Sequence, residues 1–210
     1  MSCQPADVVF YFYGITMKHF LLVASLLLAG CATPPAPTML FDLGPLPAHG
    51  AVASALPALS IATATSSPFL DNPRMVYRLA YANSQQPQQF ANNRWTMAPA
   101  QLIEQRLKAR LGQAGSTVLT GSDGALNVPL LRLELDDFSQ RFTTPAESSG
   151  QLTLRVAVFR GRLVVAQKSF TQQRPATSAD AAGGAQALAA ASDALITDVL
   201  SWLATLPLAK

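Results

Sequence analysis

Four groups of side chains in this sequence could carry chemistry, and three of them lack the partners that an active site needs. His49 is the only histidine after residue 30, and it lies in a Gly/Ala/Pro stretch that offers no Ser-His-Asp arrangement. Asp136 and Asp137 are adjacent carboxylates, but neighbouring residues of a strand point to opposite faces, so we interpret them as solvated acids at a strand end. Residues 112–117, GQAGST, lack the lysine of a phosphate loop, and no CxxC, HExxH or EF-hand pattern occurs. The sequence therefore predicts a protein that is not an enzyme and uses no metal or cofactor.

The fourth group is a single cysteine, Cys31, at the end of an apolar run. Lys18 is followed by a ten-residue apolar run at 20–29, a length typical of a secretory signal and too short to span a bilayer. The order Leu28, Ala29, Gly30, Cys31 resembles the bacterial lipobox. In that signal the thiol receives a diacylglyceryl group, the chain is cut before the cysteine, and the new amine is usually acylated with a chain such as palmitate. The alternative is a buried free cysteine in a hydrophobic helix.

The first sixteen residues fit a signal poorly, because they contain no Lys or Arg and one acid, Asp7. We therefore expect translation to start at Met17, which leaves Cys3 without a role; the alternative is a long n-region. The chain then divides into a signal peptide at 1–30, a lipidated cysteine and proline-rich tether at 31–38, and one domain at 39–210. With Cys31 lipidated, the mature chain has no disulfide, and its hydrophobic core must stabilise it.

Composition excludes one large class of partner. The net charge is +3, only 13% of residues are charged, and no dense basic run occurs, so nucleic acid is a poor candidate. The lipid alone would attach the protein to a membrane, and two or three acyl chains anchor far better than one.

The domain alternates between strand and helix patterns. Leu131, Leu133 and Leu135 share one face of a strand, and Gly161 joins the next two strands as a tight hairpin. Residues 83–89, NSQQPQQ, read as a polar loop. The pattern predicts an α+β fold, a mostly antiparallel sheet packed against two amphipathic helices, in a single domain. The expected strands are 39–47 (as a short edge), 58–66, 74–82, 129–138, 151–159 and 162–170, and the expected helices are 98–113 and an alanine-rich helix ending near Leu206.

The first helix has an apolar stripe of Leu102, Ile103, Leu107 and Leu111. Its charged residues, among them Arg106 and Arg110, are expected elsewhere on the helix. Gly183 and Gly184 weaken the start of the second helix. The predicted core includes Trp95, Leu107, Leu133, Val156 and Trp202.

Three segments carry a resemblance to a known family: FDLGP at 41–45, PFLDNPRMVYR at 68–78, and FANNRWTMAPAQLIEQRL at 90–107. Together with the lipobox and the tether, they resemble the ABC-type transport auxiliary lipoproteins, the PqiC-like group, over essentially all of 31–210. Asn72 and Arg74 depart from the family pattern, which often has arginine and glutamine there. The matching positions are Phe69, Leu70, Asp71, Pro73, Val76, Arg78, Arg94 and Trp95.

The resemblance implies a periplasmic lipoprotein that works with an MCE-domain protein of an ABC-type lipid transport system, as an accessory or docking subunit. It also implies self-association, since MCE proteins form rings. Asp71, Arg78, Arg94 and Trp95 become candidate docking residues. The structural alternatives are a core anchor for Trp95, and pairing with Asp71 or capping of carbonyls for the two arginines.

Ala32 follows the cysteine in place of the aspartate that retains lipoproteins in the inner membrane of enteric bacteria, which implies the outer membrane while leaving inner-membrane retention open. The alternative function is a lipoprotein regulator of envelope or peptidoglycan assembly. Such a regulator must reach across the cell wall, whereas the seven residues at 32–38 span only about 20 Å as polyproline II. The short tether favours a partner close to the membrane.

We predict that mass spectrometry of the mature protein will find an acylated Cys31 at its N-terminus. Cys31→Ser should leave the chain unprocessed, because the thiol that accepts the lipid is gone. An unmodified chain beginning at Met1 or Met17 would contradict this prediction.

Overall fold

The computed structural model describes residues 36–48, 56–120, 123 and 128–208. The chain divides into two units, Met1–Pro37 and Thr38–Lys210, and the strands and helices of the described residues belong to the second. The signal segment, Cys31, most of the tether and His49 lie outside the described residues.

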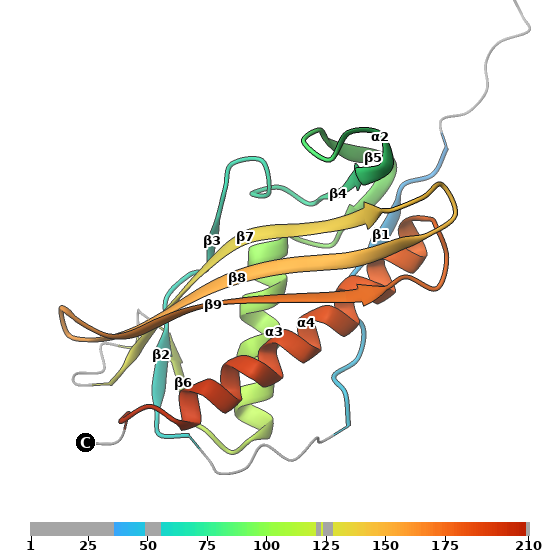
Figure 1. Cartoon of the computed structure of the whole chain (residues 1–210). Helices are drawn as coiled ribbons and strands as arrows, with labels where there is room; N and C mark the ends of the chain where they lie inside the picture. Colours follow the sequence, from blue (N-terminus) through green and yellow to red (C-terminus); the bar gives the residue numbers. More distant parts are fainter. Residues whose placement is uncertain (1–35, 49–55, 121–122, 124–127, 209–210) are drawn as a thin grey trace, which may run out of the picture. The chain divides into compact units, whose positions relative to one another are not determined.

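Three long strands form the main part of the sheet (Figure 1). β7 (Leu130–Phe142), β8 (Ser148–Arg160) and β9 (Leu163–Pro175) pair antiparallel in sequence order. The loop between β8 and β9 has two residues, because Arg160 pairs with Leu163, and Gly161 adopts the positive φ of 60° that the turn requires. The tight hairpin predicted at Gly161 is present.

The other edge of β7 is shared by three short strands that pair with it one after another in parallel. They are β2 (Leu59–Ile61), β3 (Thr65–Ser66) and β4 (Arg74–Leu79). β6 (Val118–Thr120) extends the sheet beside β2. β5 (Pro87–Trp95) pairs antiparallel with β4, and β1 (Met39–Phe41) pairs in parallel with β5; the short helix α2 (Ala80–Asn83) lies between β4 and β5.

The predicted α+β class and the single domain are confirmed, with a sheet that is mixed in direction. The long pairings are antiparallel, whereas the short strands beside β7 are parallel to it. The strand predicted at 58–66 is interrupted, because the backbone N–H of Ala64 donates to Glu104 Oε2 at 2.7 Å and not to the sheet. The strand predicted at 74–82 ends at Leu79, and the polar loop predicted at 83–89 gives way to β5 at Pro87, since a missing N–H is tolerated at the first residue of a strand.

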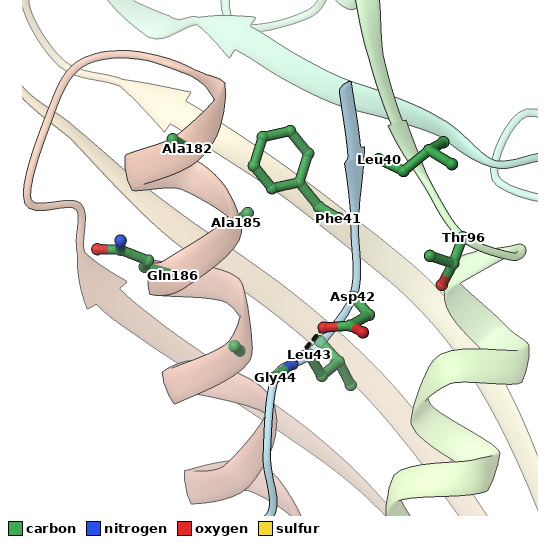
Figure 2. Close-up of a pocket in the computed structure, with 10 residues that line it drawn as sticks. Leu40, Phe41, Asp42, Leu43, Gly44, Thr96, Ala182, Ala185 and Gln186 are labelled. Atoms are coloured by element: carbon green, nitrogen blue, oxygen red, sulfur yellow. Dashed lines mark hydrogen bonds between the residues drawn. The ribbon is translucent and has the colours of Figure 1, made fainter. Parts of the chain in front are cut away.

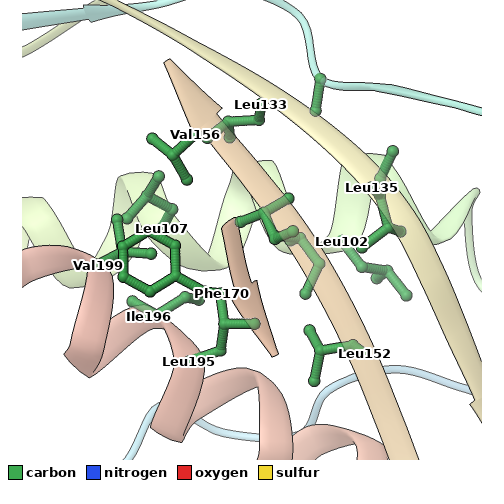
Figure 3. Packing of buried hydrophobic residues seen from close by; sticks show 14 of the residues in the cluster. Leu102, Leu107, Leu133, Leu135, Leu152, Val156, Phe170, Leu195, Ile196 and Val199 are labelled. Atoms are coloured by element: carbon green, nitrogen blue, oxygen red, sulfur yellow. The ribbon is translucent and has the colours of Figure 1, made fainter. Parts of the chain in front are cut away.

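Two helices pack on one face of the sheet, α3 (Pro99–Gln113) and α4 (Ala181–Ala204) (Figure 1). The predicted apolar stripe of α3 is buried, and Figure 3 shows its Leu102 and Leu107 facing strand residues and α4. Trp95, Leu107, Leu133 and Val156 are core residues as predicted, and Trp202 is half-buried, edge-on to Phe170 with ring centroids 5.5 Å apart. α4 is also long and apolar enough to cross a membrane, but Leu195, Ile196 and Val199 pack in this core.

The α3 prediction was wrong about two cations. Arg106 and Arg110 lie on the buried side, each 6% exposed. Both positions fall at helical spacing from the apolar stripe, so the helix carries them toward α4, where Arg106 meets Asp193 and Arg110 Nη2 meets Thr197 Oγ1 at 3.4 Å.

Glycines let the start of α4 approach its neighbours closely. The Asp180 carboxylate caps the helix by accepting from the Gly183 N–H at 2.8 Å, and this hydrogen bond lowers the pKa of Asp180. A Cβ on Gly183 would collide with the backbone oxygen of Ser178, and a Cβ on Gly184 would collide with Oε1 of the buried Gln140. The two glycines therefore weaken the helix intrinsically, as predicted, while allowing its first turn to pack.

We predict opposite effects for two alanine substitutions in helices. Gly183→Ala should destabilise the protein by about 1–3 kcal/mol, because the new Cβ meets a backbone carbonyl. Gly112→Ala should stabilise it by roughly 0.5–1 kcal/mol, because that helical position has open space around it and alanine is the better helix former. Urea unfolding of both variants measures the difference, and a stabilised Gly183→Ala would contradict the close approach.

Candidate functional site

The segment at residues 39–46, which we call the N-terminal strap, lies between α3 and α4 (Figure 2). Its β1 portion continues the sheet, and the Phe41 carbonyl accepts from the Thr96 N–H at 2.8 Å. The strap then turns at Gly44, which has a φ of 67° and whose N–H donates to Asp42 Oδ1 at 2.7 Å. Leu43 is buried in the core, so the strap is part of the folded domain.

One buried cation, Arg106 of α3, holds the strap and α4 together. Its Nε and Nη2 donate to the two carboxylate oxygens of Asp193 on α4, each at 2.8 Å. Nη1 donates to the Gly44 carbonyl at 2.8 Å, and Nη2 also donates to the Pro45 carbonyl at 2.9 Å. A guanidinium has five N–H donors in a planar fork, so one side chain can join three segments that are distant in sequence.

Two shallow cavities flank the strap. The larger, about 320 Å³, lies between the strap and the N-terminal half of α4, where Ala182, Ala185 and Ala189 leave room for it. The smaller, about 220 Å³, lies between the strap and α3 and is lined in part by Arg106. Among the described residues no three His, Cys, Asp or Glu side chains gather to hold a metal, and the cavities offer packing surface without a set of groups for acid–base chemistry.

The loop at 67–73 presents part of the family-like motif on the surface. Asn72 fixes its shape, since Asn72 Nδ2 donates to the Phe69 carbonyl at 2.8 Å and Asn72 Oδ1 accepts from the Arg74 N–H at 3.0 Å. Leu70 is buried, whereas Phe69 is 40% exposed and Asp71 is exposed. The loop therefore displays an aromatic ring and a carboxylate from a held backbone.

The other three candidate docking residues occupy β4 and β5. Trp95 is 1% exposed and packs edge-on to Phe138 at a centroid distance of 5.2 Å, which is the geometry of a core anchor. Arg78 Nη1 donates to the Ser84 carbonyl at 3.3 Å. Arg94 Nη1 donates to the carbonyls of Phe90 and Asn93 at 2.7 and 2.9 Å. Both arginines cap carbonyls, one of the two structural alternatives that the sequence left open.

Arg94 donates hydrogen bonds to an irregular part of β5. Arg74 pairs with Arg94, but Val76 already pairs with Gln89, so β5 bulges between Gln89 and Arg94. The two carbonyls to which Arg94 donates belong to this bulge. The Arg94 side chain therefore stabilises the bulge of β5. That bulge positions Trp95 and sets the register of β5 with β1.

Asp136 and Asp137 are separated by their surroundings. Asp136 is exposed and pairs with Arg155 at 3.2 Å, in agreement with a solvated acid. Asp137 follows a bulge in the pairing with β8 and is partly buried, and that burial raises its pKa. The hydrogen bond from Ser139 Oγ at 2.9 Å and the nearby Arg78 and Arg141 oppose the rise. The prediction of a solvated Asp137 was wrong, because a bulge shifts the alternation on which it relied.

Sequence reasoning missed the Arg106–Asp193 pair. A usable signal was present, because Arg106 stands three residues after Ile103 and one before Leu107, on the stripe itself. Its partner lies 87 residues away, and no periodicity identifies which acid that is.

Two arginines each contact carboxylates, and we predict that burial decides how much each contributes to the free energy of unfolding. Arg106→Gln should lower the free energy of unfolding by about 3–5 kcal/mol, because it leaves a partly buried Asp193 and two strap carbonyls without their donor. Arg155→Gln should lower it by less than about 1 kcal/mol, since Arg155 is 39% exposed and water replaces its partners. Chemical unfolding compares the two, and equal small losses would show that Arg106 does not hold the strap.

Two solved structures share this fold. A crystal structure of a protein from Xanthomonas campestris, of the family DUF330, aligns with a TM-score of 0.63 at 20% identity, over 79% of this chain and 91% of that one. A crystal structure of an uncharacterized protein aligns with a TM-score of 0.64 at 15% identity, over 80% and 99%. No curated protein sequence matches the chain.

The family model of the ABC-type transport auxiliary lipoprotein component matches residues 41–199. This match begins within the strap and ends within α4, so it contains the long strands of the sheet, most of both packed helices and the Arg106–Asp193 pair. The resemblance inferred from the sequence is thereby confirmed. The chain belongs to the family of ABC-type transport auxiliary lipoprotein components.

Proposed function

We propose that this auxiliary lipoprotein is anchored at the periplasmic face of the outer membrane through acylated Cys31, and that it docks onto an MCE-domain protein of an ABC-type lipid transport system. It acts as an accessory subunit without catalysis, and it self-associates to match the ring symmetry of that partner. The membership in a transport auxiliary lipoprotein family supports a transport partner and a membrane anchor.

The observation that carries the docking proposal is the division of the motif by burial. Leu70, Val76 and Trp95 are buried, and their presence in the motif follows from packing alone. Phe69 and Asp71 are exposed on a loop whose backbone Asn72 holds in place, so packing does not explain them. A rigid loop with an exposed aromatic side chain has the properties of an interface anchor, because little conformational entropy is lost when it binds.

The lining of the cavities supports a role in assembly over one in chemistry. The described residues beside the strap contribute apolar side chains and single polar groups, with no nucleophile adjacent to a base. The seven-residue tether keeps the domain near its membrane, which fits a partner whose end lies at the same membrane.

We predict that Phe69→Ala will reduce co-purification of the native lipoprotein with its MCE partner by roughly tenfold or more, the loss expected for an interface anchor of about 1.4 kcal/mol. The matched control is Leu163→Ala, which truncates a more exposed apolar side chain on the β8–β9 hairpin. Quantitative pull-down from native membranes measures both, with melting temperatures recorded for each variant.

The control should bind like the wild type, and both variants should melt within a few degrees of it. Equal losses for Phe69→Ala and Leu163→Ala would show that the loop is not the docking surface. Recovery of a peptidoglycan synthase with the wild-type protein, and of no MCE protein, would favour the alternative role in envelope assembly.

A further inference from the structure

Four arginines gather on the outer face of the sheet, opposite the helices, in the half that contains β1, β4 and β5. Arg74 and Arg94 are register partners, and Arg78 and Arg141 are register partners, so each pair lies side by side on one face. Both pairs lie on the outer face, because adjacent strand residues alternate: Gln140, next to Arg141, points toward Gly184 of α4, and Trp95, next to Arg94, is buried against Phe138. We call Arg74, Arg78, Arg94 and Arg141 the arginine patch.

These cations form no ion pair within the described part of the chain, although Arg78 and Arg141 lie close enough to Asp137 to act on it electrostatically. None of the four lies within ion-pair distance of a described carboxylate. Three of them donate to uncharged groups: Arg74 to Gln89 Oε1, Arg78 to the Ser84 carbonyl, and Arg94 to two carbonyls of the β5 bulge. The nearby acid, Asp137, is partly buried and hydrogen-bonded by Ser139 and Gln151.

The far half of the same face has a different charge pattern. There Arg155 pairs with Glu134 at 2.9 Å and with Asp136 at 3.2 Å. Arg132 lies over the ring of Phe159 at 4.5 Å from its centroid. On this face the far half therefore balances Arg132 and Arg155 against Glu134 and Asp136, whereas the half near β1 carries four arginines.

An exposed apolar side chain adjoins the patch at the point where the chain enters the domain. Leu40 is the register partner of Arg94 and is 65% exposed, so it lies on the same face as the patch; Met39, which is 55% exposed, precedes it and points to the opposite face of β1. Seven residues separate them from Cys31, a reach of about 20 Å as polyproline II. Cations and apolar side chains held that close to a lipid anchor match the two layers of a bilayer surface, phosphate outside and acyl chain within.

We propose that the arginine patch, with Leu40, lies on the anionic phospholipid surface of the membrane that holds the anchor. The proposal rests on the lipid anchor of the proposed function, and it assigns the motif residues Arg78 and Arg94 to the membrane, leaving the loop at 67–73 for the protein partner. The lipid tether and the patch together fix which face of the domain turns toward the bilayer. The tether alone leaves the domain free to rotate.

The test uses the mature chain from residue 31 with Cys31→Ser, so that no acyl chain contributes. It is floated with vesicles of phosphatidylglycerol mixed into phosphatidylcholine, and with vesicles of phosphatidylcholine alone. We expect binding to the anionic vesicles only, and its loss as salt is raised, since Arg74 is exposed and the other three arginines are only partly buried. Arg74→Gln with Arg141→Gln should weaken binding roughly fivefold for each arginine, and therefore about 25-fold together.

The matched control is Arg132→Gln with Arg162→Gln, which removes the same charge from the far half of the protein. Equal losses for the two double variants, or no binding of the unaltered chain to anionic vesicles, would overturn the proposal. So would a patch variant that keeps its vesicle binding but no longer co-purifies with the MCE protein, since the patch would then be a protein interface. A melting curve for each variant excludes loss of the fold, and the vesicle assay is independent of the pull-down that tests the docking function.

Discussion

The arrangement of this domain depends on a single desolvated guanidinium. Arg106 is buried where α3, α4 and the N-terminal strap meet, and a cation in that position is tolerated only if its donors are satisfied. Asp193 supplies the compensating negative charge, and two strap carbonyls accept the remaining hydrogen bonds of the Arg106 guanidinium. Because these partners come from two segments, α4 and the strap, and Arg106 itself comes from α3, the strap takes part in joining the two helices. The segment that leads to the lipid is thus built into the core of the fold.

Much of this fold could be predicted from local pattern, because its long elements have uninterrupted periods. Leu131, Leu133 and Leu135 alternate cleanly, and Leu102, Leu107 and Leu111 repeat at helical spacing, so their buried faces followed from the sequence. The parallel pairing of β4 with β7 did not, since it joins residues more than sixty positions apart. Asp137 and the β5 bulge were missed for a related reason: a bulge inserts residues that keep the strand but change the alternation.

The candidate site was predictable in part. Its residues were identified from the resemblance to a family more than from hydrophobic pattern or charge. The motif residues do lie around one region of the sheet, but its members divide into a core tryptophan, two arginines that cap carbonyls, and an exposed loop. The sequence pattern alone presents them as one set. Only their burial distinguishes the motif residues that pack in the core from those that are exposed on the surface. Only the register between β4, β5 and β7 brings Arg74 and Arg141 into the same patch.

The strap also determines how the domain responds to a pull. A protein tied to a membrane by its N-terminus and bound elsewhere to a partner experiences tension along the tether, and that tension enters the domain at Thr38. It is resisted first by the three residues of β1, whose hydrogen bonds to β5 run across the strand direction, and then by the hydrogen bonds of Arg106 to the carbonyls of Gly44 and Pro45. A pull on the tether is therefore shared between the sheet, through the pairing of β1 with β5, and the two packed helices, through Arg106 and Asp193.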